Sequence, residues 1–245
     1  IPTQSSDSIS NLISKSKSVS KSNVNFSSRP IVSLNRFERK KNVELVLRAY
    51  AHLHKRIHDT IHTHTQTNAN THTHTHTQTN THTRTRTYPK LIIAGGYDPR
   101  NLENKEYHQE LCTLSRQLGI SSQDISFRPN VSDHERAELL QSALCVAYTP
   151  HREHFGIVPL EAMYAGCPVV AVNSGGPMET IVDQETGFLI DHHDDVDDDH
   201  DQDNHETTVQ LYADALWKLC TNPQKALDMG RKGHSHVQQT FGLEH

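Results

Sequence analysis

Hydrophobic residues along the chain follow two patterns that alternate. Short apolar runs are typical of buried strands, and longer segments with apolar residues every three or four positions are typical of amphipathic helices. Strands are predicted at residues 31–35, 90–94, 125–127, 144–148, 168–172 and 187–190. Helices are predicted at residues 43–57, 104–118, 133–142, 158–165, 177–182, 208–221 and 223–240. This alternation predicts an α/β fold, a Rossmann-like parallel sheet with helices on both faces.

Three segments lack either pattern. Residues 1–28 are rich in Ser and Lys, residues 58–87 form a Thr-His tract, and residues 191–206 are mostly Asp and His. None offers an apolar face that would repay the entropy of ordering it. We therefore predict a disordered lead over 1–28 and a single domain over 29–245, with disordered inserts at 58–87 and 191–206. The remaining residues make one Rossmann-like unit of ordinary size.

The two low-complexity inserts suggest metal binding only weakly. Histidines such as His72, His74 and His76 would take up Zn or Ni as any His-rich tract does, but no fixed geometry supports a physiological site. The Asp-rich insert lacks the regular ligand spacing and central Gly of an EF-hand, so we interpret it as a solvated acidic loop. It carries eight Asp and one Glu without Lys or Arg, a charge of −9 against −5 for the whole chain.

The rest of the chain therefore carries a charge of about +4. This mild excess fits an anionic ligand and argues against nucleic acid, whose binders concentrate basic residues on one face. The four cysteines lie far apart without a CxxC pair, as expected for small core residues in a reducing compartment. No apolar run approaches the roughly 18 residues of a membrane-spanning helix, and no signal peptide opens the chain. These features predict a soluble domain.

The stretch Glu153–Glu161, with the sequence EHFGIVPLE, places two carboxylates eight positions apart across a Phe-Gly turn. Pro159 is favoured in a first helical turn, and Gly166 falls where that helix would end. Glu153 is therefore predicted on a loop and Glu161 in the first turns of a helix. The free N–H groups of a helix N-terminus bind phosphate oxygens. A hydroxyl-rich ligand with a phosphate suits this site, although a solvated loop acid and a helix-terminus charge would show the same spacing.

Other strand ends carry further candidate residues. Arg36 and Lys41 lie in a basic turn after the first strand, at the edge where open α/β sheets bind ligands. Glycine pairs follow two more strands, at residues 95–96 and 175–176, and the loop at 127–131 leaves the sheet at the same edge. Taken singly, a surface basic cluster and ordinary strand-to-helix turns explain these segments more simply.

Together, however, the segments resemble the nucleotide-sugar-binding half of retaining GT-B-fold glycosyltransferases, the glycogen synthase-like superfamily that includes glycosyl transferases group 1. Within this superfamily, the motif sequences are most similar to those of the mannosyltransferases that form α-1,3 and α-1,6 linkages on the dolichol-linked precursor of N-glycans. The matching stretches are NRFERKKN at 35–42, AGGYD at 94–98, EHFGIVPLEAM at 153–163 and AVNSGGP at 171–177. The resemblance covers about residues 29–57, 88–190 and 208–242.

The resemblance implies transfer of mannose from GDP-mannose with retention of configuration and without a metal or other cofactor. Arg36 and Lys41 would grip the donor diphosphate, Glu153 would orient the sugar, and Glu161 would accept bonds from the ribose. Glu153, Arg36 and Lys41 are thereby the catalytic candidates. The implied donor contacts are Arg36, Lys41, Val131, Glu153, Phe155, Gly156, Ile157 and Glu161.

The resemblance also implies a setting. Such enzymes act on a dolichol-linked glycan acceptor at the cytosolic face of the endoplasmic reticulum membrane, alongside other mannosyltransferases of the pathway. The chain begins with Ile1 and lacks the amino-terminal GT-B domain that builds the acceptor cleft. We therefore expect a fragment that binds the donor and does not transfer mannose alone.

Two other classes stay open at this point. A glycoside hydrolase also uses two carboxylates, but the basic turn and the helix amides would then have no role. A non-catalytic nucleotide-sugar-binding module is the other alternative. The residues also leave open a different donor such as a UDP-sugar, because nothing in them selects guanine over uracil.

Overall fold

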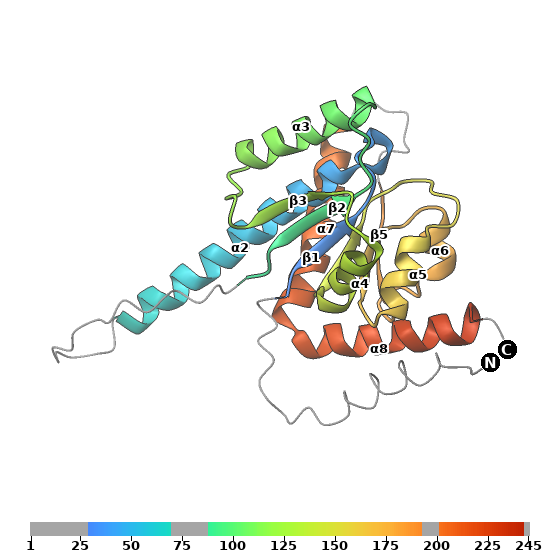
Figure 1. Ribbon diagram of the computed structural model, residues 1–245. Coiled ribbons are helices and arrows are strands. Elements are labelled where there is room, and N and C mark those ends of the chain that lie inside the picture. The colour runs from blue at the N-terminus through green and yellow to red at the C-terminus, as the bar shows by residue number, and fades with distance from the viewer. Residues whose placement is uncertain (1–28, 70–87, 193–200, 243–245) are drawn as a thin grey trace, which may run out of the picture.

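The computed structural model describes residues 29–69, 88–192 and 201–242, and it places side chains in these ranges except at 61–69 and 201–204. A sheet of six parallel strands forms its centre, in the order β3-β2-β1-β4-β5-β6 (Figure 1). The strands are β1 (Ile31–Leu34), β2 (Leu91–Gly95), β3 (Ile125–Pro129), β4 (Cys145–Tyr148), β5 (Val169–Val172) and β6 (Gly187–Ile190). The predicted parallel α/β fold is confirmed.

Helices connect the strands and cover the sheet. They are the 3-10 turn η3 (Arg39–Lys41) and the α-helices α2 (Val43–Ala69), α3 (Leu102–Gln117), α4 (Asp133–Ser142), α5 (Ile157–Tyr164), α6 (Gly176–Thr180), α7 (Asp201–Thr221) and α8 (Pro223–Thr240). The predicted bounds of α4, α8 and β6 agree with the structure to the residue. Those of α3, α5, α6 and the other strands agree to within two residues.

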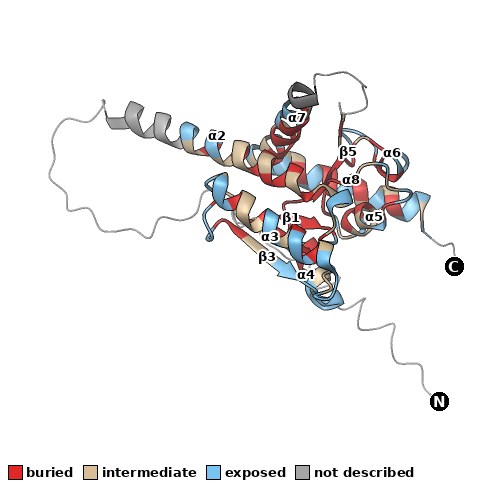
Figure 2. Cartoon of the chain, turned by 90° about the horizontal axis from the view of Figure 1, so that it is seen from above, coloured by how far each residue is buried: buried red, intermediate tan, exposed pale blue. Residues whose placement is uncertain are grey.

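Alternate residues of each strand enter two separate cores, because successive side chains point to opposite faces of a sheet. On one face, Ile31 and Ile93 pack with buried residues of α2 and α7. On the other face, Val32 and Ile92 pack with buried residues of α4 and α5. Figure 2 shows the buried residues gathered where helices meet the sheet, with the outer helix faces exposed. The continuous apolar strands are therefore explained by cover on both sides.

The strand order reverses direction between β1 and β4. β1 pairs with β2 on one side and with β4 on the other, so the crossovers run outward from this point in both directions. Ligands of open α/β sheets bind outside the carboxyl ends of the strands at such a reversal. The segments after β1 and β4, which contain Arg36 and Glu153, lie at this position.

Helix α2 corrects one predicted boundary. We predicted a helix over 43–57 and a disordered insert over 58–87, but α2 continues to Ala69. Disorder was predicted because the insert lacks an apolar face, but this criterion does not apply to its first residues, 58–69, which continue an existing helix. Extending a helix that is already nucleated and packed costs far less than nucleating one, so polar residues continue it. The rest of the tract, with His72, His74 and His76, lies outside the described residues.

Helix α7 corrects a second boundary. We predicted an acidic insert over 191–206 and a helix from residue 208, but α7 begins at Asp201. The sequence around the start of α7 is rich in Asp, and negative charge near a helix N-terminus is favoured by the positive end of the helix dipole. Negative charge here therefore supports a helix start. The lead at 1–28 and residues 193–200 lie outside the described residues.

The cysteines are free and belong to the interior or its margin. Cys145 and Cys167 are buried, and Cys112 and Cys220 are partly buried. Burial raises the pKa of the Cys167 thiol and of the Cys220 thiol to about 12. These thiols stay protonated at neutral pH, which suits the predicted role of small core residues.

Candidate functional site

The basic turn after β1 is held by its backbone and by one buried aromatic side chain. Phe37 is fully buried, and its N–H donates to the carbonyl of Gly96 at 3.1 Å. Arg36 and Lys41 flank this anchor. The turn η3 ends at Asn42, which adopts a left-handed conformation with φ 45°. The hydroxyl of Thr149 donates to the carbonyl of Lys41 at 2.7 Å, which ties the turn to the segment after β4.

Gly95 allows β2 to approach the end of β1. A Cβ at this position would lie 1.9 Å from the carbonyl oxygen of Asn35. Within the glycine pair at 95–96, Gly95 thus serves close packing beside the basic turn.

The loop after β4 is held against the second glycine pair. The N–H of Gly176 donates to the carbonyl of Glu153 at 2.7 Å. A Cβ on Gly175 would lie 2.2 Å from that carbonyl oxygen, and a Cβ on Gly176 would lie 2.2 Å from the carbonyl oxygen of Phe155. Glycine is therefore required at both positions for the loop to pass. The pair positions Glu153 through the backbone.

Helix α5 begins directly after this loop. Its N-cap is Gly156, in a left-handed conformation with φ 67°. The N-terminus is a source of free backbone N–H groups, and Pro159 falls in its first turn as predicted. Two of the residues that precede and open the helix, Phe155 and Ile157, are exposed.

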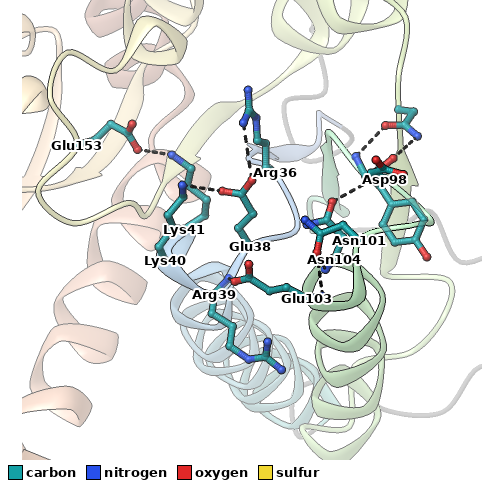
Figure 3. A network of polar contacts seen from close by, with 12 residues as sticks. Arg36, Glu38, Arg39, Lys40, Lys41, Asp98, Asn101, Glu103, Asn104 and Glu153 are labelled. Atoms are coloured by element: carbon teal, nitrogen blue, oxygen red, sulfur yellow. Dashed lines mark hydrogen bonds and ion pairs between the residues drawn. The ribbon is translucent and has the colours of Figure 1, made fainter.

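Lys41 and Glu153 meet across the site. The Nζ of Lys41 forms an ion pair with Oε2 of Glu153, and their side chains are 15% and 32% exposed (Figure 3). Beneath them, burial raises the pKa of the Tyr148 hydroxyl, and the nearby charge of Glu153 raises it further. Tyr148 is thus a neutral wall of the site at physiological pH.

Arg36 behaves differently from Lys41. Its side chain is 71% exposed, and its guanidinium lies 3.7 Å from Glu38. Glu38 also lies 3.1 Å from the ammonium of Lys40, so one carboxylate faces two cations. Figure 3 shows Glu38 between Arg36 and Lys40. Arg36 and Lys40 are thus the exposed cations of the basic turn, joined through the 15% exposed Glu38.

A cavity of about 670 Å³ joins these groups. Among the predicted site residues, Arg36, Lys41, Val131, Glu153, Gly156 and Ile157 line it. Phe155 and Glu161 do not line it, and the carboxylate of Glu161 forms an ion pair with Arg136 of α4. The volume is within the range of pockets for small ligands and cofactors.

Four charged lining residues were not among the predicted site residues: Glu38, Lys40, Asp133 and Arg136. Glu38 and Lys40 lie within the basic turn, so its charge density was a signal for them. Asp133 and Arg136 follow the Ser132 cap of α4, whose side chain bonds the N–H of Glu135. The cavity is lined by four cationic and three carboxylate side chains, an excess that suits an anionic ligand.

Among the residues whose side chains are described, within 29–60, 88–192 and 205–242, no cluster of three His, Cys, Asp or Glu is arranged to hold a metal ion. Over 29–69, 88–192 and 201–242, no helix has the length and apolar character to cross a membrane.

Parallel strands in this order, with a cavity of mixed charge at the reversal point, define a doubly wound, Rossmann-like unit with a ligand cavity at the usual place. The family model described as glycosyl transferases group 1 matches residues 79–202, and the chain belongs to this family.

Curated relatives agree. The chain is 38% identical to the α-1,3/1,6-mannosyltransferase ALG2 of Homo sapiens, over 87% of this chain and 42% of that protein. It is 45% identical to the Candida albicans protein of the same name, over 64% of this chain and 38% of that protein. The chain thus spans about two fifths of the curated relatives it matches.

Solved structures show the same fold. The chain resembles the C-terminal domain of a glycosyl transferase group 1 family protein, LpcC from Francisella tularensis, with a TM-score of 0.61 and 18% identity over 92% of this chain and 95% of that domain. It also resembles Anabaena HepE, solved in complex with UDP and glucose, with a TM-score of 0.61 and 20% identity over 97% of this chain and 49% of that protein. The fold is that of the C-terminal half of a GT-B enzyme.

Proposed function

We propose that this chain is the donor-binding half of a mannosyltransferase that transfers mannose from GDP-mannose, with retention, to a dolichol-linked oligosaccharide through α-1,3 or α-1,6 linkages. The contact between Lys41 and Glu153 carries the proposal: at the reversal point of the sheet it joins a cation of the kind that binds phosphate and a carboxylate of the kind that binds sugar hydroxyls. The identities to ALG2 mannosyltransferases support the choice of sugar and acceptor.

The proposed chemistry needs a site that stabilises a departing diphosphate while positive charge develops on the sugar ring. Lys41 and Arg36 neutralise the leaving group, which is work that a metal ion performs in many phosphoryl-transfer enzymes. In this proposal the reaction uses no metal or other cofactor. Glu153 binds hydroxyls of the mannose and stabilises the charge on the ring.

Other groups in the cavity and beside it bind the rest of the donor. The N-terminus of α5, near Phe155, Gly156 and Ile157, offers backbone N–H groups to sugar or phosphate oxygens. Val131 lies along the base, and Glu161 accepts bonds from the ribose. A hydrolase is the weaker reading, because Lys41 and Arg36 would have no role in it.

The acceptor places the full protein at the cytosolic face of the endoplasmic reticulum membrane, with other mannosyltransferases of the pathway as partners and no nucleic acid. The chain matches about two fifths of its curated relatives, so the acceptor cleft belongs to the rest of the enzyme. A second candidate is a donor-binding module for a UDP-sugar, which the UDP and glucose bound to Anabaena HepE favour.

Calorimetric titration of GDP-mannose and UDP-glucose into the purified chain tests the donor. We expect GDP-mannose to bind tighter by roughly tenfold or more, about 1.4 kcal/mol or greater. Equal or tighter binding of UDP-glucose would favour the second candidate. Transfer from GDP-mannose to a dolichol-linked acceptor is then measured with a full-length protein that contains this chain, and its loss in the Lys41→Ala variant is the expected result. Full transfer by that variant would contradict the proposal.

A further inference from the structure

Arg136 lies where helix α4 meets the donor cavity. A capping box fixes the start of α4: the Ser132 hydroxyl accepts from the N–H of Glu135, and the Glu135 carboxylate accepts from the N–H of Ser132. Arg136 follows in the first turn and lines the cavity. Its side chain is 33% exposed, so part of the guanidinium is shielded from water.

The partner of Arg136 is the carboxylate that does not itself line the cavity. Nη2 of Arg136 donates to Oε2 of Glu161 on α5, a residue 25 positions further along the chain. Nε of Arg136 is buried and has no hydrogen-bond partner among the described residues. The contact with Glu161 is therefore what sets the orientation of the guanidinium in this part of the chain.

The contact with Arg136 uses only part of the hydrogen-bonding capacity of the Glu161 carboxylate. An ionised carboxylate offers about four lone-pair sites on its two oxygens. Arg136 engages Oε2, which leaves Oε1 to accept from the two hydroxyls of a ribose. The positive charge of Arg136 also offsets a carboxylate that would otherwise repel a bound diphosphate, since like charges within a few ångströms are costly in a partly desolvated site.

We propose that Arg136 is a positioning residue that holds the Glu161 carboxylate for the ribose hydroxyls of the nucleotide. The proposal rests on the donor-binding function above and adds a residue to which that function gave no role. Arg136 acts through Glu161, so its effect depends on the hydroxyls that Glu161 is proposed to bind.

The test compares GDP with 2′,3′-dideoxy-GDP, which lacks both ribose hydroxyls. Each nucleotide is titrated calorimetrically into the wild-type chain and into the Arg136→Met, Arg136→Lys, Glu161→Gln and Arg136→Met/Glu161→Gln variants. Arg136→Met should weaken GDP by about 5-fold to 20-fold, the range for losing one charge-assisted contact at a partly exposed site. It should weaken dideoxy-GDP by less than about twofold.

The double variant should lose no more GDP affinity than Glu161→Gln alone, because the two residues act as one unit. Arg136→Lys should recover part of the loss, since it keeps the charge without the planar fork. Arg231→Met removes the guanidinium of an exposed ion pair on α8 and is the matched control, with unchanged affinity expected. Melting temperatures of all variants report on folding.

Equal losses for GDP and dideoxy-GDP in Arg136→Met would overturn the proposal and place Arg136 on the diphosphate or in the fold. Additive losses in the double variant would overturn it too. A different result would contradict the proposed donor: tight binding of UDP together with weak or no binding of GDP. The same comparison then uses UDP and 2′,3′-dideoxy-UDP, because the ribose is common to both nucleotides.

Discussion

Lys41 and Glu153 form an ion pair although 112 residues separate them in the chain. One follows β1 and the other follows β4, two neighbouring strands at the point where the sheet order reverses. Glu153 is thus the partner of the cation that we assign to the diphosphate. In the proposed function, the donor phosphate would compete with the Glu153 carboxylate for Lys41.

Lys41 and Arg36 should therefore contribute unequally to GDP affinity. Lys41→Ala removes a partly buried charge-assisted contact worth roughly 1.5–3 kcal/mol, so GDP affinity should fall about 10-fold to 150-fold. Arg36→Ala should cost less, because the Arg36 side chain is 71% exposed against 15% for Lys41. Isothermal titration with GDP and guanosine measures both. Guanosine affinity should hardly change, and an equal loss for the two ligands would place the residue outside the phosphate site.

Neutralising Glu153 should affect the binding of GDP and of GDP-mannose differently. Glu153→Gln removes the carboxylate that pairs with Lys41, so GDP affinity should stay constant or rise by a few-fold. GDP-mannose should lose affinity relative to GDP, because the mannose hydroxyls lose a charged acceptor. Titration of both ligands into the variant and the wild type gives the ratio. A fall in GDP affinity as large as that for Lys41→Ala would contradict the assignment of Glu153 to the sugar.

Any side chain at position 176 should destabilise the fold for steric reasons. Gly176→Ala would place a Cβ 2.2 Å from the carbonyl oxygen of Phe155. Overpacking of this kind costs roughly 1–3 kcal/mol, which lowers the melting temperature by about 2–12 °C in a chain of this size. Gly96→Ala is the control, since its Cβ would meet only the flexible Arg36 side chain, at 3.4 Å. Equal thermal shifts for the two variants would show that the close approach of the loop is not what limits position 176.

His108 should make the fold weaker in acid. It packs edge-on against Phe37 at 5.0 Å and Phe127 at 5.5 Å between ring centres, and burial lowers its pKa from the usual 6.5. The unfolded chain therefore binds a proton more readily than the folded chain. The stability contributed by neutral His108 is present above pH 6.5 and is lost as the pH falls through the folded pKa.

Thermal unfolding at pH 7.5 and 5.5 tests this dependence. His108→Phe keeps an aromatic ring among its neighbours and removes the titration, so the variant should lose less stability between the two pH values than the wild type. His134→Gln changes an exposed histidine and serves as the control, with a wild-type response expected. A His108→Phe variant with the full wild-type acid sensitivity would contradict the role of His108.

Local patterning was enough for much of this fold. Continuous apolar strands separated by amphipathic segments favour a parallel sheet covered on both faces, and the bounds of α4, α8 and β6 agree with those predicted from the hydrophobic pattern. The basic turn and the stretch Glu153–Glu161 were visible for the same reason, because each is contiguous in sequence. The predicted disorder from residue 58 and the helix start at 208 were wrong, since helix propagation and helix-dipole effects depend on the neighbouring packed turns rather than on local hydrophobicity.

Only the tertiary structure decided which charges face one another. The order of the strands places the segments after β1 and β4 side by side, and so pairs Lys41 with Glu153. The packing of α4 beside α5 pairs Arg136 with Glu161, a contact between a residue that the sequence analysis singled out, Glu161, and one that it did not. An ion pair between two elements forms only if the elements pack in the right register and bring the two charges within a few ångströms. The periodicity of a single chain segment does not predict either condition. The sequence thus determined which elements form and where the candidate chemistry lies, and the folded arrangement determined how those residues combine.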